Sequence, residues 1–172
     1  MSDLFLAPHG DDEVLFSCYT LLRQKPRVIV CLYSDATRMA ETEKAMGLVG
    51  CDWLTSMLPE TKVDEEVLRG FLADLDGPAV ERVFAPAVEE GGHEHHSLVG
   101  QLALDVFGTK VRPYMTYKRG FGRSTGKTAV IPTAVERALK KAAMQCYTSQ
   151  IKNPATAFWF TDESEWWKEY QG

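Results

Sequence analysis

Near its N-terminus the chain reads Leu4-Phe5-Leu6-Ala7-Pro8-His9-Gly10-Asp11-Asp12-Glu13, an apolar run that turns at once into imidazole and carboxylate groups. The apolar residues predict a buried strand from Leu4 to Pro8, and the residues from Asp12 onward have helical patterning. The polar cluster therefore follows the carboxyl end of a strand, where open α/β sheets keep their active sites. We expect this stretch both to begin the sheet and to carry the functional site.

Strand-like and helix-like segments alternate along the rest of the chain. Expected strands cover 4–8, 27–33, 52–57, 82–85 and 111–117, and expected helices cover 12–24, 37–48, 63–75, 97–107 and 133–150. This alternation predicts an α/β fold built from βαβ units with a parallel sheet. We expect 118–131 to form a loop or hairpin. The tail from Ile151, which contains Trp159, Trp166 and Trp167, is expected to pack across the body, with a partner-binding tail as the alternative.

The composition narrows the class of protein. A length of 172 residues with 45% hydrophobic residues fits one domain, residues 1–172, with a core that needs no disulfide or metal for folding. A net charge of -5 and a pI near 5.4 argue against a general nucleic-acid-binding surface.

The four cysteines form no CxxC pair and are expected to be buried free thiols. Without a signal-like N-terminus or an 18-residue apolar span, we expect a cytoplasmic protein with no membrane span, and a homo-oligomer stays open.

A second cluster, His93-Glu94-His95-His96, contains three of the four histidines and follows the expected strand that ends at Pro86. His9 and Asp12, three residues apart on a tight turn, could converge on one cation, and His96 could arrive from the neighbouring strand as the third ligand. Three protein ligands leave positions for water and substrate, as catalytic zinc requires.

Two further residues of these clusters suit catalysis. Asp11 lies beside a ligand and is expected to act as the general base toward water. His93 is expected to stabilise an oxyanion or to protonate a leaving amine. Each cluster alone has a plainer explanation, since acidic residues complement the dipole at a helix start and a histidine run can be a solvated loop. Their joint occurrence at the ends of parallel strands favours a site.

These residues resemble the motifs of the PIG-L/LmbE-like family of metal-dependent de-N-acetylases. Pro8 to Glu13 is similar to its (A/P)HPDDE motif, and His93 to His96 is similar to its HxxH motif. Further landmarks follow in the expected order: Arg38-Met39-Ala40-Glu41 for R-x-x-E, Ala45 to Gly50 for an A-x-x-L-G-like stretch, and Tyr147-Thr148-Ser149-Gln150 for a terminal SQ helix.

The resemblance implies a Rossmann-like, three-layer α/β/α fold with a mostly parallel sheet. It also implies one zinc ion held by His9, Asp12 and His96, and Asp11 as the general base. His93 matches the histidine that assists charge stabilisation and leaving-group protonation. Arg38 matches an arginine that contacts the sugar or another polar group of the substrate, a role that suits a guanidinium. The alternative for this arginine is a surface charge paired with Glu41 or Glu43.

The sequence departs from the family pattern at two positions of the motifs. Gly10 replaces the usual proline, which loosens the turn but removes no ligand. His95 replaces the common aspartate or asparagine of HxxH, so His95 and His96 compete as the third ligand, and the spacing favours His96. The connection between Tyr33 and Arg38 is also short, which reduces the region that shapes the substrate pocket in the family.

A basic stretch stands out in this acidic chain, at Arg112, Lys118, Arg119, Arg123 and Lys127. Solvated hairpin charges would explain it. If the loop folds toward the metal, Arg123 and Lys127 could bind a phosphate, nucleotide or other anionic part of the substrate. The nearby glycines match neither a phosphate-binding loop nor a dinucleotide fingerprint, because the former has the wrong spacing and the latter lies outside the first βα turn.

Together these features predict a zinc-dependent amidohydrolase that removes an acetyl group from an acetylated amino sugar or a related small substrate. One alternative keeps the fold and changes the bond, giving a phosphoesterase with Mg²⁺ or Mn²⁺, although histidine ligands favour zinc. The other alternative is a metal-stabilised binding module without catalysis. The adjacent Asp11 argues against it, because a structural metal site has no use for a base.

Overall fold

The computed structural model describes residues 2–118 and 122–168. Its strands are β1 (Ser2–Ala7), β2 (Arg27–Val30), β3 (Trp53–Thr55), β4 (Val80–Pro86), β5 (Val111–Tyr114), β6 (Tyr117–Lys118), β7 (Gly122–Arg123), β8 (Thr128–Ala129) and β9 (Trp166–Trp167). Its helices are α1 (Asp12–Gln24), α2 (Ala36–Val49), α3 (Glu65–Leu75), α4 (Glu94–Phe107), α5 (Ala134–Met144) and α6 (Thr148–Lys152), with 3-10 turns η1 (Gly108–Lys110) and η2 (Ala157–Thr161).

The main sheet has the strand order β3-β2-β1-β4-β5-β9-β8, in which the first five strands run parallel. The chain moves outward from β1 through β2 to β3 and then returns to the other side of β1 as β4. The strand order therefore reverses between β1 and β4, and the loops after these two strands diverge there. Such a switch point is where open α/β sheets bind ligands.

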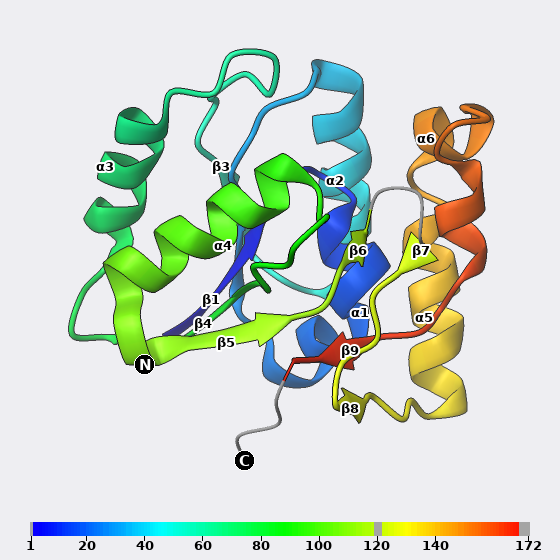
Figure 1. Ribbon diagram of the computed structural model, residues 1–172. Helices are drawn as coiled ribbons and strands as arrows, with labels where there is room; N and C mark the ends of the chain where they lie inside the picture. The colour runs from blue at the N-terminus through cyan, green and yellow to red at the C-terminus, as the bar shows by residue number, and fades with distance from the viewer. Residues whose placement is uncertain (1, 119–121, 169–172) are drawn as a thin grey trace.

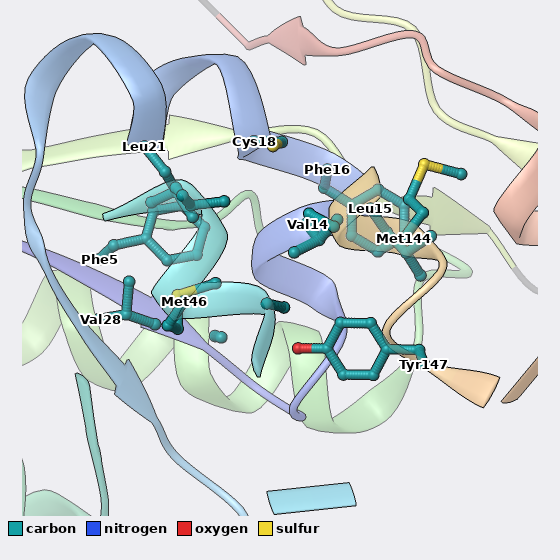
Figure 2. Close-up of a cluster of buried hydrophobic side chains, with 14 of the residues drawn as sticks. Phe5, Val14, Leu15, Phe16, Cys18, Leu21, Val28, Met46, Met144 and Tyr147 are labelled. Atoms are coloured by element: carbon teal, nitrogen blue, oxygen red, sulfur yellow. The ribbon is translucent and has the colours of Figure 1, made fainter. Parts of the chain in front are cut away.

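Helices cover both faces of the sheet (Figure 1). Helices α1, α2 and α5 contact one another on one face, and α3 contacts α4 on the other. Each layer buries its own apolar cluster against the sheet. Figure 2 shows the first cluster, where Phe5, Val28 and Met46 pack near Tyr147. The second cluster contains Leu6 and side chains from α3 and α4. The expected three-layer α/β/α architecture with a mostly parallel sheet is confirmed.

Local sequence explains where several helices begin. Asp35 accepts a hydrogen bond from the backbone of Arg38 at the start of α2, and Asp64 caps α3 in the same way. Thr133 and Glu136 form a reciprocal capping box at the start of α5. These caps satisfy backbone N–H groups that the first helical turn leaves without partners. They hold the start of each helix in register with its loop.

Two expected elements are divided in the structure. The expected helix 133–150 is wrong as one helix, because α5 ends at Met144 and the short α6 begins at Thr148. Between them Tyr147 leaves helical geometry, and its fully buried ring joins the apolar cluster. The expected strand 111–117 is also divided, because Tyr114 ends β5 and Tyr117 pairs in a separate two-stranded sheet.

The C-terminal tail packs across the body, as expected. Strand β9 pairs antiparallel with β5 and β8 and so extends the main sheet. Just before it, Glu165 forms a fully buried ion pair with Lys140, at 2.7 Å. The pair lies beside a kink in α1, where the backbone of Ser17 is not helical. Lys140 donates a hydrogen bond to the carbonyl of Leu15, and Glu165 accepts one from the backbone N–H of Tyr19. The pair thereby replaces the helical hydrogen bond that the kink breaks.

None of the helices within 2–118 and 122–168 has the length and apolar character needed to cross a bilayer. All four cysteines are free thiols: Cys18 and Cys31 are buried, and Cys51 and Cys146 are partly exposed. The expectation of buried thiols therefore holds for two of them.

Candidate metal centre

The two polar clusters of the sequence meet at the switch point of the sheet. His9 follows the end of β1, Asp12 begins α1, and His96 lies in the first turn of α4 after the neighbouring strand β4. The two clusters lie more than eighty residues apart in the chain, yet parallel pairing of β1 with β4 brings them together.

His9, Asp12 and His96 form a group that could hold a metal ion. Nδ1 of His9 lies 3.1 Å from Oδ2 of Asp12, and Nε2 of His96 lies 3.2 Å from the same oxygen. Ligands of tetrahedral zinc at about 2.0–2.2 Å from the ion stand about 3.3 Å from one another. Neither ring nitrogen of the buried His96 has a hydrogen-bond partner among the described residues. A buried imidazole that makes no well-formed hydrogen bond, set beside a carboxylate oxygen at 3.2 Å, fits a divalent cation.

The electrostatics of this group also favour a cation. Burial would raise the pKa of Asp12, but the charge of His96 and the hydrogen bond from His9 hold it well below its usual range. Burial lowers the pKa of His9, but the hydrogen bond and charge of Asp12 outweigh this and raise it overall. Asp12 is therefore ionised throughout the physiological range and offers a negative ligand between two imidazoles.

Asp11 lies beside this group but faces a different partner. Its carboxylate Oδ2 accepts a hydrogen bond of 2.8 Å from Nη1 of Arg38. Burial raises its pKa to about 8, against the opposing charge of Arg38 and with help from the charges of Asp12 and Glu13. Its backbone has φ 152° and ψ -27°, a region that residues with a Cβ rarely occupy. Asp11 thus combines a proton affinity near neutrality with a strained backbone, as functional residues often do.

The strained turn is held by the side chains of Glu13 and Tyr147, to which the sequence assigned no role. Oε2 of Glu13 accepts a 2.9 Å hydrogen bond from the backbone N–H of Asp11. The other oxygen of Glu13 accepts a hydrogen bond from the hydroxyl of Tyr147, whose oxygen also lies 3.2 Å from the hydroxyl of Thr42. All these side chains are buried, and burial raises the pKa of Glu13 to about 7. Tyr147 belongs to the segment quoted above for the SQ helix, but only its buried position reveals this contact.

His93 and His95 complete a cluster of all four histidines. His93 caps α4, and its Nδ1 accepts the backbone N–H of His95 at 3.2 Å. Burial and the neighbouring imidazoles lower the pKa of His93 to about 3. A neutral ring that accepts at Nδ1 must carry its proton on Nε2. The ring lies 5.4 Å from that of His9 and 5.1 Å from that of His96, centroid to centroid.

A cavity of about 170 Å³ opens beside the metal-binding group. Its polar lining includes Asp11, Arg38 and Glu60 from the first half of the chain and Gln150 from the second. Its apolar wall comes from Tyr117 and the tail, whose Trp159 packs 4.6 Å from the tyrosine ring. The remaining lining residues are His9, Asp12, Leu15, Thr156 and Phe160. The tail therefore forms one wall of the candidate site.

No protein-family model matches the chain, and no curated protein matches it. Solved structures do. A deacetylase of the teicoplanin biosynthetic pathway superposes with a TM-score of 0.71 at 17% identity, over 92% of this chain and 88% of its own. The deacetylase Dbv21, for the A40926 pseudoaglycone, gives 0.69 at 17%, over 94% and 89%. The hydratase GalB of Pseudomonas putida, for 4-carboxy-2-hydroxymuconate, gives 0.72 at 15%, over 94% and 83%.

The chain therefore shares its fold with these deacetylases and with the hydratase. A hydratase and deacetylases share this fold, so the fold leaves the reaction open and the site must decide it.

Two landmarks of the PIG-L/LmbE-like pattern meet in space. The carboxylate of Glu41 in α2 accepts hydrogen bonds from the hydroxyls of Thr148 and Ser149 and from the backbone of Ser149, at 2.7–3.0 Å. This contact joins α2 to α6. Arg38, one turn earlier, bonds to the carbonyl of Gly10 and to Asp11. Arg38 lines the cavity, and its side chain is 12% exposed.

The departure at Gly10 has a steric reason. A Cβ at this position would collide with the hydroxyl of Thr42 and approach Met39 and Arg38 on α2. The glycine therefore lets α2 pack closely against the turn that carries the candidate ligands. Proline would require a different spacing between these elements.

The basic stretch is placed only in part. Arg112 bonds to the carbonyls of Thr109 and Val111 at the far end of β5. Lys118 lies 4.0 Å from Glu89, and Lys127 is an exposed residue just before β8. Arg119 lies outside the described residues, as does the side chain of Arg123. The cavity lining given above includes neither Lys127 nor Arg112.

Proposed function

We propose that the chain is a metal-dependent hydrolase that removes an N-acetyl group from an acetylated amino sugar or a related small substrate. The observation that carries the proposal is the placement of the Asp11 carboxylate, which Arg38 holds at 2.8 Å, beside the group of His9, Asp12 and His96 in one cavity. The two deacetylases with this fold support removal of an acetyl group, because each is named a deacetylase.

The residues would divide the chemistry as follows. A divalent ion held by His9, Asp12 and His96 would supply Lewis acidity, which polarises the acetyl carbonyl and acidifies a water molecule. The two imidazoles and one carboxylate favour zinc over magnesium. In this scheme Asp11 takes a proton from water as the new C–O bond forms. The same carboxyl group returns that proton to the amine nitrogen as the C–N bond breaks, which yields acetate and a free amine.

His93 is proposed to stabilise the transition state by hydrogen bonding. Its Nδ1 is occupied by the backbone of His95, so its Nε2–H is the group available to a developing oxyanion. A pKa near 3 keeps the ring neutral, which favours this role over donation of a full proton to the leaving amine. Arg38 is proposed to orient Asp11 and to contact a polar group of the substrate from the cavity wall.

The substrate would lie between the polar and aromatic walls of the cavity. Tyr117 and Trp159 offer flat apolar surfaces to this cavity, and Arg38, Glu60 and Gln150 offer hydrogen-bonding groups. A sugar ring has a corresponding division between its C–H face and its hydroxyl rim. We keep Arg123 and Lys127 as proposed contacts to an anionic extension of the substrate, beyond this cavity.

The test is acetate release by zinc-loaded protein from N-acetylglucosamine derivatives that are free, phosphorylated or nucleotide-linked, with Asp11→Asn as the paired variant. We expect the variant to bind zinc and to lose about a hundredfold or more in rate, since general base catalysis contributes about 10²–10⁴. Phosphate release without acetate release would replace the proposal by a phosphoesterase. Zinc binding without turnover of any compound would favour a binding role.

A further inference from the structure

His95 occupies an unusual place in the cluster of histidines. Its Nδ1 lies 2.9 Å from Nε2 of His9, and the two rings are tilted by 50° with centroids 5.1 Å apart. The contact joins the first turn of α4 to the end of β1, 86 residues away in sequence. His96, the next residue, instead faces Asp12. Adjacent histidines on one helix turn therefore have different partners.

The two nitrogens of His9 face opposite groups. Nδ1 lies 3.1 Å from Asp12, on the side of the metal-binding group, and Nε2 faces His95. A neutral imidazole carries one proton, so a ring that presents the Nδ1 lone pair to a cation carries its proton on Nε2. That N–H then needs an acceptor, because the site is largely enclosed: His9 has 14% of its side chain exposed.

Glu60 is the competing acceptor. Its Oε2 lies 4.0 Å from Nε2 of His9, which is beyond hydrogen-bonding distance, and it accepts a 2.7 Å hydrogen bond from the hydroxyl of Ser34. His95 is closer by more than an ångström. The described geometry therefore favours the imidazole over the carboxylate as the partner of His9.

His9, His93 and His95 also lie close enough to hold a second ion. The distance between His9 and His95 argues against this arrangement. Two nitrogens on one tetrahedral zinc stand about 3.3 Å apart, since each Zn–N bond is about 2.0–2.1 Å. The observed 2.9 Å is the usual length of a hydrogen bond with the proton between the nitrogens. A second ion would also require His9 to lose both of its ring protons.

We propose that His95 is a positioning residue for the metal centre: its Nδ1 accepts the Nε2–H of His9 and holds that imidazole in the tautomer and orientation that present Nδ1 to the ion. The inference rests on the proposed metal centre and adds to it a specific partner outside the ligand set. Partners of this kind change metal affinity by about 10–100-fold when they are removed.

The test compares two substitutions of His95 that differ only in the acceptor. Asn places its Oδ1 at the same number of bonds from the backbone as Nδ1 of histidine, so His95→Asn keeps an acceptor for His9. His95→Leu places a methyl group at that position, so its side chain is similar in size to that of Asn but has no acceptor. Zinc affinity is measured by competition with a chromogenic chelator, without substrate, on the full chain. Glu60→Gln serves as the control for the competing acceptor.

We expect His95→Leu to weaken zinc binding about 10–100-fold and His95→Asn to bind within about threefold of the wild type. Glu60→Gln should also bind within about threefold. Thermal melts of the metal-free proteins show whether the Leu variant folds. If it does not, long-range ¹H–¹⁵N NMR of the wild type replaces it. That spectrum should show His9 protonated at Nε2.

Three results would overturn the inference. Equal zinc affinity in the Leu and Asn variants would mean that the acceptor is irrelevant. Two zinc ions in the wild type, one of them lost in both variants, would make His95 a ligand. A wild-type protein that binds no zinc would remove the metal centre itself. Only this last outcome also contradicts the proposed function, so the two failures are distinguishable.

Discussion

Replacing Asp11 by Asn should make the metal-free protein more stable at alkaline pH while it removes catalysis. The folded protein raises the pKa of Asp11 from 3.8 to about 8. A carboxyl group with a raised pKa contributes stability that is fully present below its unfolded pKa and is lost as pH rises through its folded pKa. The wild type therefore has a buried charge at high pH that Asn does not have.

The magnitude follows from linkage. Between about pH 5 and its folded pKa, Asp11 holds one proton in the folded chain and none in the unfolded chain, so stability falls by about 1.4 kcal/mol per pH unit. The loss of stability accumulates over the roughly three pH units between pH 5 and the folded pKa of about 8, and it ends just above that pKa. The total loss from about pH 5 to about pH 9 is therefore about 4 kcal/mol. For a domain of this size it corresponds to about 8–16 °C in Tm.

The assay is urea or thermal unfolding of metal-free wild type and Asp11→Asn at about pH 5 and about pH 9. Other titrating groups are shared by the two proteins, so the difference between the two pH values isolates Asp11. We expect the variant to gain about 4 kcal/mol relative to the wild type over this range. A relative stability that changes by less than about 1 kcal/mol between the two pH values would contradict a raised pKa of Asp11.

Three further outcomes are expected. Trp159→Ala should raise KM about five- to tenfold with a smaller change in kcat, because the side chain forms part of the cavity wall. Trp159→Phe should restore KM, and a fall in kcat alone would contradict this role. Lys140→Met should lower the free energy of unfolding in urea by about 3–5 kcal/mol, since it leaves Glu165 charged and buried. Substitution of the exposed Lys141 by Met should lower it by about 1 kcal/mol or less. Zinc at about a hundred times its Kd should stabilise the chain by about 2.7 kcal/mol, and His96→Ala should abolish the shift in Tm.

The apolar patterning predicted most of the fold. Strands and helices with strong periodicity fall close to their expected positions, because burial on one face constrains many residues at once. Boundaries that depend on a single contact were missed. The helix expected over 133–150 divides where Tyr147 turns inward to Glu13, a contact that lies 134 residues away in sequence. No local pattern encodes such a partner.

The α/β class and the chemistry available at the ends of two strands could be predicted from residue order, because alternation and residue type are local properties. Which groups meet depends on the folded arrangement. It placed His96 against Asp12 and His95 against His9, although the two histidines are neighbours on α4. It also brought Trp159 from the tail into the cavity wall. Helix rotation and strand pairing set these distances, and both depend on the packing of the whole core.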